Sequence, residues 1–187
     1  MLGFLVKEIA ATLLVLTILP PSGLGQEFLP SPPSDEGLIY RLDDQNKLVP
    51  LPYEEGRTPL NATKIAKSTK TSYVELKGEH AAVVLSSRPR LFFFTPQRTG
   101  SHPPFLVRLT PIRGARRATV IAEAGLTGLA ISSEEIVKPT IRVLATVGDK
   151  VFMELRPRTS LALGEYAIIG EDLTRIATFL VATDTMR

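Results

Sequence analysis

The sequence predicts an all-β domain folded as an antiparallel β-sandwich, with a partly closed barrel as the alternative. Short apolar runs recur at spacings of about 8 to 12 residues and are separated by turn-forming residues, a pattern typical of both architectures. After the first 25 residues, no stretch shows a convincing 3.6-residue helical period. The chain has 187 residues, 44% of them hydrophobic, which is enough for one domain with an apolar core.

Residues 1–25 have the organisation of a signal peptide. Lys7 lies in a short leading segment, and the uncharged run from Ile9 to Leu19 is shorter than the roughly 20 apolar residues that cross a bilayer. Gly23 and Gly25 place small residues just before a cleavage at Gln26. We therefore expect export to the bacterial periplasm, cell envelope or exterior, with no membrane span after cleavage; an uncleaved anchor is the alternative.

Two regions follow the cleavage site. Residues 26–36 (QEFLPSPPSDE) are rich in Pro and Ser and lack periodicity, which predicts an extended linker. Residues 37–187 are expected to form the single β domain. The chain has no cysteine, which excludes disulfides, thiol catalysis and cysteine-ligated zinc and favours a bacterial envelope over animal secretions.

The expected strands are apolar runs bounded by Gly, Pro, Asp, Asn or Lys. In chain order they are Leu38–Leu42, Leu48–Leu51, Tyr73–Leu76, Ala81–Leu85, Leu91–Phe94, Phe105–Leu109, Thr119–Ala122, Ile141–Val147, Val151–Leu155, Glu165–Ile169 and Ile176–Val181.

Turns predict which strands pair. Residues 43–46 are a four-residue polar turn, and residues 77–79 are expected to join the strands on either side. Gly148-Asp149 between two β runs is a strong hairpin signal. The polar segment 54–72 is expected to be a loop with at most a helical turn.

The run Leu161–Ile169 (LALGEYAII) is interrupted by Gly164, whose conformational freedom lets the chain turn into a strand. In that strand Tyr166 and Ile168 should face one side of the sheet, and Ala167 and Ile169 the other.

The segment RPRTSLALGEYAII, followed by IATFLVA, resembles the C-terminal hairpin of exported bacterial proteins of unknown function that end in a Leu-x-Pro-Gly-Glu-Tyr-Ala-like element. Leu163 stands where those proteins have proline. The resemblance extends loosely over the mature domain, through GLIY at Gly37–Tyr40, the Gly78–Val84 segment and the FLVRL strand. It implies a β-rich fold and an envelope location, and no activity.

The sequence offers few reactive constellations. His80 and His102 are not spaced as a metal-binding pair, and His80 is expected to be a surface or turn residue. No Gly-x-Ser-x-Gly elbow is present. Solvated turn residues explain the acidic side chains better than a catalytic pair does; those available for such a pair are Glu123, Glu134, Glu135, Glu165 and Glu171. We expect no metal and no cofactor.

The formal net charge of +3 is mild, and a nucleic-acid partner is not expected. The basic cluster that favours binding consists of Arg108, Arg113, Arg116 and Arg117, beside a Gly-containing hairpin turn. Arg113, Arg116 and Arg117, which surround Gly114, are expected to project into water, where they can meet carboxylates or phosphates and contribute little to folding. The hypothesis is a non-enzymatic exported domain that contacts a protein partner or an anionic envelope component; the alternative is a hydrolase with a carboxylate pair.

Overall fold

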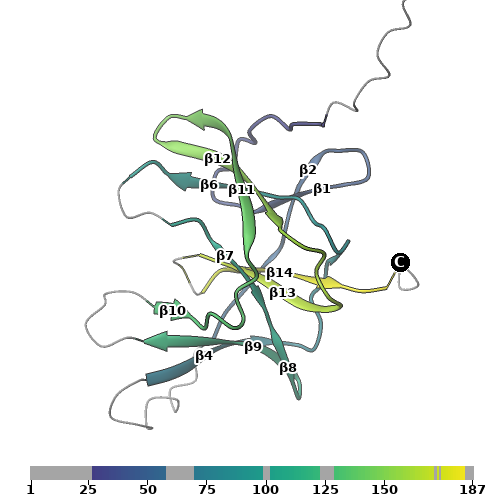
Figure 1. Ribbon diagram of the computed structural model, residues 1–187, viewed down its shortest axis with the longest axis vertical. Coiled ribbons are helices and arrows are strands. Elements are labelled where there is room, and N and C mark those ends of the chain that lie inside the picture. Colours follow the sequence, from purple (N-terminus) through teal and green to yellow (C-terminus); the bar gives the residue numbers. More distant parts are fainter. Residues whose placement is uncertain are drawn as a thin grey trace, which may run out of the picture.

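Three β-sheets stack on one another in the computed structural model (Figure 1). The structure describes residues 27–57, 70–98, 102–122, 129–170, 172 and 174–183. Within these ranges there is no helix, and none of the sheets closes into a barrel, so the predicted all-β sandwich class is confirmed. The predicted signal peptide lies outside the described residues.

The upper sheet in Figure 1 has the strand order β11-β12-β6-β1-β2, with every pair antiparallel. Its strands are β1 (Tyr40–Leu42), β2 (Leu48–Pro50), β6 (Leu91–Pro96), β11 (Pro139–Val147) and β12 (Lys150–Pro157). Both hairpins predicted here are confirmed. Gly148, at φ 59°, opens the two-residue turn between β11 and β12.

The middle sheet has the order β3-β14-β13-β7. A fifth strand, β5, pairs in parallel with the second half of β14, beyond the part that β3 occupies. The strands are β3 (Tyr53–Glu54), β5 (Val84–Leu85), β7 (Phe105–Arg108), β13 (Gly164–Ile169) and β14 (Ile176–Val181). The predicted hairpin of β13 and β14 is confirmed.

The lower sheet has the order β10-β9-β4, and β8 pairs with the beginning of β9. Its strands are β4 (Lys70–Lys77), β8 (Thr110–Ile112), β9 (Ala115–Ala122) and β10 (Leu129–Ile131). The apolar runs Phe105–Leu109 and Thr119–Ala122 lie on either side of Gly114 in the sequence and were expected to form its hairpin. The hairpin is instead β8–β9, and β7 belongs to the middle sheet.

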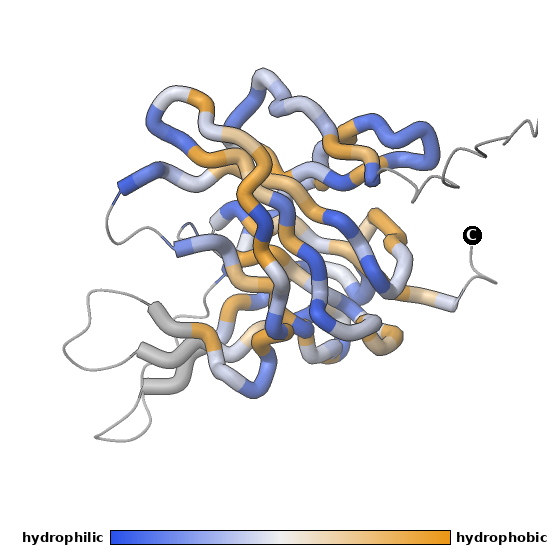
Figure 2. Tube along the Cα trace, turned by 45° about the horizontal axis from the view of Figure 1, so that its top comes forward, coloured by the Kyte–Doolittle hydropathy of each residue, from blue (hydrophilic) through white to orange (hydrophobic). Residues whose placement is uncertain are grey.

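The middle sheet is buried on both faces, which makes the fold a three-layer sandwich. Tyr166 and Ile168 pack in the core shared with the upper sheet, together with Leu91 and Leu155. Ala167 and Ile169 pack in the core shared with the lower sheet. The predicted alternation of side chains along β13 is therefore confirmed. Figure 2 shows hydrophobic residues along the strands in the interior and hydrophilic residues in many of the turns.

A third apolar cluster covers the outer face of the upper sheet, where Phe92 and Phe152 are fully buried. Phe93 points to the opposite face and joins the inner core, as expected of a core strand. The N-terminal segment 27–36 contains no strand but contacts this sheet: the Phe28 carbonyl accepts a hydrogen bond from Arg90 (2.9 Å). Glu36 pairs with Lys150 at 2.9 Å.

Two expectations about the strands are wrong. Residues 77–79 do not join β4 to β5 as a hairpin, because the chain turns at Gly78 (φ 94°) and crosses from the lower to the middle sheet. The backbone N–H of Ala81 then donates to Glu165 and that of Leu180 to Val83, which holds the crossing segment on the middle sheet. The described ranges also hold fourteen strands, more than the eleven apolar runs that were expected to be strands, because several are only two or three residues long.

Candidate functional site

The predicted basic cluster does not form one surface. Arg113 is exposed in the β8–β9 turn. Arg108 lies on β7 of the middle sheet, is exposed, and donates from Nη2 to the carbonyl of Leu163 at 3.4 Å. The Arg117 guanidinium stacks over the Tyr73 ring at 4.5 Å from its centroid.

Arg116 is buried, with 1% of its surface exposed, and the expectation that it projects into water is wrong. The turn is confined to residues 113 and 114, so β9 already begins at Ala115. Side chains along a strand alternate between the two faces. Arg116 therefore points with the buried Ala118 toward the middle sheet, whereas Arg117 points away from it.

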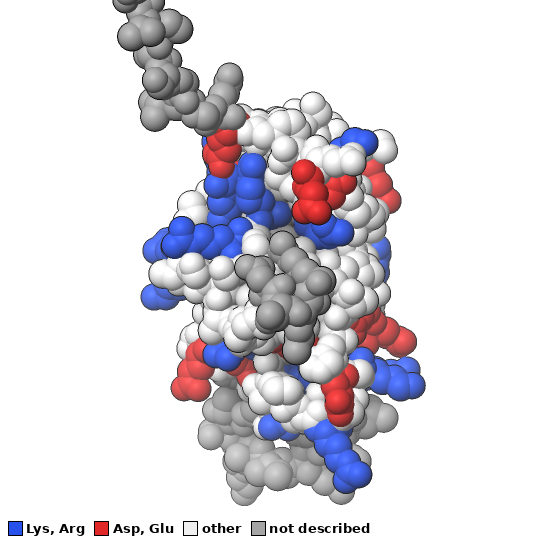
Figure 3. Space-filling view, turned by 90° about the vertical axis from the view of Figure 1, so that its right-hand side faces the viewer, with Lys and Arg blue, Asp and Glu red and all other residues white. Residues whose placement is uncertain are grey.

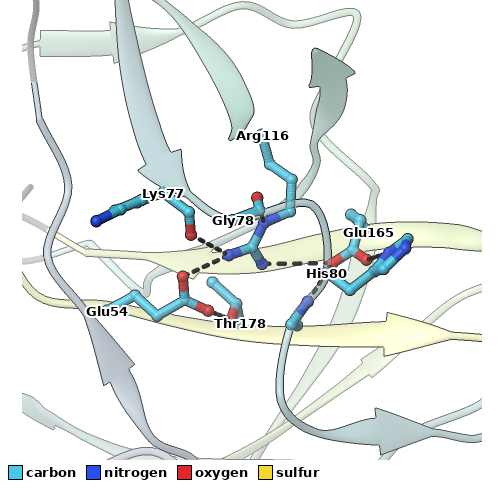
Figure 4. A network of polar contacts seen from close by, with 8 residues as sticks. Glu54, Lys77, Gly78, His80, Arg116, Glu165 and Thr178 are labelled. Atoms are coloured by element: carbon cyan, nitrogen blue, oxygen red, sulfur yellow. Dashed lines mark hydrogen bonds and ion pairs between the residues drawn. The ribbon is translucent and has the colours of Figure 1, made fainter. Parts of the chain in front are cut away.

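The Arg116 guanidinium is the centre of a polar network between the lower and middle sheets (Figure 4). Its Nη2 donates to Glu54 Oε2 at 2.5 Å, and its Nη1 donates to Glu165 Oε2 at 3.4 Å. Nε donates to the Gly78 carbonyl at 3.0 Å, and Nη2 also reaches the Lys77 carbonyl at 3.3 Å. One side chain thus links β3, β13 and the end of β4.

The two carboxylates have further donors. Glu165, 4% exposed, also accepts from the backbone N–H of Ala81 and lies 3.0 Å from His80 Nδ1. Glu54 accepts from the hydroxyl of Thr178 on β14. Glu165 lies at the start of its strand, as predicted. It is buried and paired with Arg116, however, and is not a solvated turn residue.

The main role of this network is to connect the lower sheet to the middle sheet. Taking an arginine and a carboxylate out of water is costly, and their attraction repays that cost only when the remaining donors and acceptors are also satisfied. Four acceptors surround Arg116, which meets the condition. Removing Arg116, for example, would leave the buried Glu165 carboxylate without its cation.

A pocket of about 610 Å³ opens beside the network. Glu165, His80, Arg108 and Glu134 are among its lining residues. The His80 side chain is 72% exposed, in agreement with the predicted surface position, and only its Nδ1 is held by Glu165.

Of the other acidic candidates, Glu134 and Glu135 line the same pocket as Glu165. Glu135 receives the backbone N–H of Thr119 at 2.6 Å and its hydroxyl at 2.9 Å, so it fastens the segment before β11 to β9. Glu123 and Glu171 lie outside the described residues.

A second pocket, of about 380 Å³, is lined by three arginines that the sequence analysis did not single out: Arg41, Arg88 and Arg90. We call it the arginine pocket. It lies where β1 of the upper sheet approaches β5 of the middle sheet. Figure 3 shows Lys and Arg side chains gathered on the upper part of the flank that faces right in Figure 1. Only the Arg88-Pro89-Arg90 spacing was visible in the sequence, because Arg41 is far away along the chain.

Acidic side chains occupy part of this basic region. Glu154, buried on β12, accepts from Arg90 (2.5 Å) and Arg156 (2.7 Å). Glu27 pairs with Arg156 and with Arg142 (3.2 Å). The hydrogen bond to Glu154 is the main reason that the pKa of Arg156 is raised, while desolvation opposes it.

Among the described residues, no three His, Asp or Glu side chains lie close enough to hold a metal ion. Nor does that part of the chain contain a helix with the length and apolar character needed to traverse a bilayer.

Comparison with protein-family models, curated proteins and solved structures found no match. The resemblance of the C-terminal hairpin to exported bacterial proteins therefore stays a prediction.

Proposed function

We propose that the chain is an exported, non-enzymatic β domain that acts by surface contact with a protein partner or an anionic envelope polymer. The observation that supports this proposal is the position of Arg116 between Glu54 and Glu165. A hydrolytic carboxylate pair needs space between its carboxyl groups for the scissile bond or a water molecule. Here a guanidinium group fills that space, and the remaining hydrogen bonds of both acids go to protein groups.

The contact function is tested by capture from bacterial envelope extracts. The purified chain is immobilised, incubated separately with envelope proteins and with isolated anionic envelope polymer, and crosslinked or sedimented. We expect saturable binding in one of the two arms that weakens as salt is raised, because exposed charges are screened within about 10 Å at 0.1 M salt. An unrelated β-sandwich of similar net charge is the control; equal retention by that control in both arms contradicts the proposal.

Export is tested separately. Small residues precede Gln26, so the N-terminus of the protein recovered outside the cytoplasm should lie near this residue. N-terminal sequencing of that fraction measures it. Recovery of a chain that still begins at Met1 in the soluble external fraction contradicts cleavage, and recovery only in membranes supports the anchor.

A hydrolase is the second candidate function, and the contact between His80 and Glu165 favours it. A carboxylate that fixes one ring nitrogen of an imidazole leaves the other free to act as a general base, and His80 lines an open pocket. Chromogenic ester and glycoside substrates test this function with wild type and His80→Gln. Turnover that is lost in the variant while the melting temperature stays unchanged supports the hydrolase; no turnover by either protein contradicts it.

A further inference from the structure

We propose that the arginine pocket binds a phosphate-type oxyanion. The inference deepens the proposed contact function, because it names the chemical group on an anionic partner that the surface recognises. Binding of the isolated ion does not depend on that function.

Two segments that are far apart in the sequence bring the three guanidinium groups to the pocket. Arg41 lies on β1, Arg88 in the connection between β5 and β6, and Arg90 directly before β6. Backbone pairing of Arg41 with Leu91 fixes β1 against the start of β6. The arginines are thus positioned by strand pairing and not by flexible loops alone.

The charge of the lining favours an anion. Three arginines face one acidic residue, Asp44. Arg90 is already paired with Glu154, but Arg88 and Arg41 have no ion pair among the described residues. The one side-chain hydrogen bond of Arg88 runs from Nε to the Ser160 hydroxyl at 2.8 Å, and that acceptor is neutral.

Arg41 carries the most specific signal. Its Nε is buried and has no hydrogen-bond partner within the part of the chain that the structure describes, and its Nη1 makes only a long contact of 3.4 Å to the Leu42 carbonyl. A buried donor left without an acceptor is destabilising, and such groups are rare in folded proteins. Because Nε itself is closed to solvent, an oxyanion in the pocket would be met by the terminal Nη1 and Nη2 groups of Arg41.

The geometry of guanidinium groups favours a tetrahedral oxyanion. Each arginine presents parallel N–H donors that match phosphate or carboxylate in bidentate fashion. A phosphate group offers more acceptor oxygens than a carboxylate and can meet two or three arginines at once. Leu42, Val84 and Pro89 add apolar walls, which lower the local dielectric and strengthen such contacts.

The test is calorimetric titration of the full chain with inorganic phosphate at constant ionic strength, with chloride as the competing anion. We expect saturable binding by wild type and binding weakened by about tenfold in Arg41→Gln, the loss of one charge-assisted contact. Arg88→Gln should weaken binding similarly, and because Arg88 is exposed its substitution does not threaten folding. The matched control is Arg113→Gln, which removes the same charge from the exposed β8–β9 turn and should bind phosphate like wild type.

Further measurements distinguish a lipid headgroup from a free ion as the source of the oxyanion. They also test the phosphate site and the contact function independently of each other. Flotation with vesicles of phosphatidylglycerol and phosphatidylcholine, with and without added phosphate, distinguishes a lipid headgroup from the free ion; competition by phosphate supports one shared site. Absence of phosphate binding by wild type, or equal weakening by Arg113→Gln, overturns the inference while leaving the capture experiment valid. Phosphate binding without any capture of a partner would overturn the contact function alone.

Discussion

Arg116 is the residue on which the junction of the lower and middle sheets depends. Its guanidinium reaches a carboxylate on β3, another on β13 and two carbonyls at the end of β4. A lysine could not replace it, because one ammonium group cannot donate in the fixed, planar directions that these four acceptors require. Its effect on stability should therefore be large.

Replacing Arg116 by Gln should lower the free energy of unfolding by about 3 to 5 kcal/mol, because Glu165 is left buried without its cation. For a domain of this size, that corresponds to a melting temperature lower by about 10 °C. Thermal unfolding followed by circular dichroism measures the change. Arg113→Gln is the control and should stay within about 0.5 kcal/mol of wild type; equal effects of the two substitutions would show that the network contributes nothing.

Tyrosine ionisation should reveal burial at alkaline pH. The pKa of Tyr40, Tyr53 and Tyr166 is raised above the ordinary value near 10, first of all because burial disfavours the charged phenolate. Below about pH 10 both folded and unfolded chains keep these protons, so the contribution to stability is fully present. As pH rises further the unfolded chain releases its protons first, and stability falls.

The chain contains four tyrosines and no tryptophan, so tyrosinate absorbance can be read without interference. We expect the titration curve of the folded protein to lie at higher pH than that of the same protein in denaturant, and the free energy of unfolding to fall above about pH 10. Superimposable titration curves would contradict the burial of the three hydroxyl groups.

At the scale of single elements, β13 begins at a glycine for a conformational reason. Gly164 has φ 145°, a region that residues with a Cβ rarely adopt, although a Cβ there would only touch Arg108 at 3.7 Å. The constraint is thus backbone strain and not lack of space. Gly170, at the other end of the strand, has an ordinary φ and open space around it.

Gly164→Ala should lower the free energy of unfolding by about 1 to 3 kcal/mol, whereas Gly170→Ala should change it little. Denaturant unfolding at fixed temperature measures both variants. If both alanines cost the same, the strain at residue 164 is not what limits substitution there.

Hairpins with strong local signals could be predicted from the sequence, and features that depend on other parts of the chain could not. Gly148-Asp149 specifies the pairing of its two neighbouring strands locally, and that hairpin is present. Gly164 likewise marks the start of β13. The separation of β4 from β5 depends on Glu165, which is more than 80 positions away from Ala81 and captures its N–H. The burial of Arg116 could not be predicted because the segment ARRA places one alanine and one arginine on each face of the strand. The sequence therefore did not show which face of β9 points to the core.

Across the whole molecule, the middle sheet contributes to two cores at once. Ile168 belongs to the core beneath the upper sheet, and its neighbour Ile169 belongs to the core above the lower sheet. Loosening either core should weaken the sheet that both share. The three layers are therefore expected to unfold together.

Ile168→Val and Ile169→Val test this expectation as a matched pair, since each removes one methylene from a site exposed by 1% or less. Each should cost about 0.5 to 1.5 kcal/mol and shift one common transition in calorimetry. Two resolved transitions, of which each variant shifts only one, would show that the upper and lower layers unfold independently.

The position of β14 in the chain has a consequence for the order of folding. This strand, the last of those described, pairs with β13 on one side and with β3 and β5 on the other, and its Thr178 bonds to Glu54 across 124 positions. A chain emerging from its N-terminus therefore carries β3 and β5 long before their common partner exists. Such distant pairings close large loops and form slowly, so the middle sheet should be completed only after β14 has been synthesised.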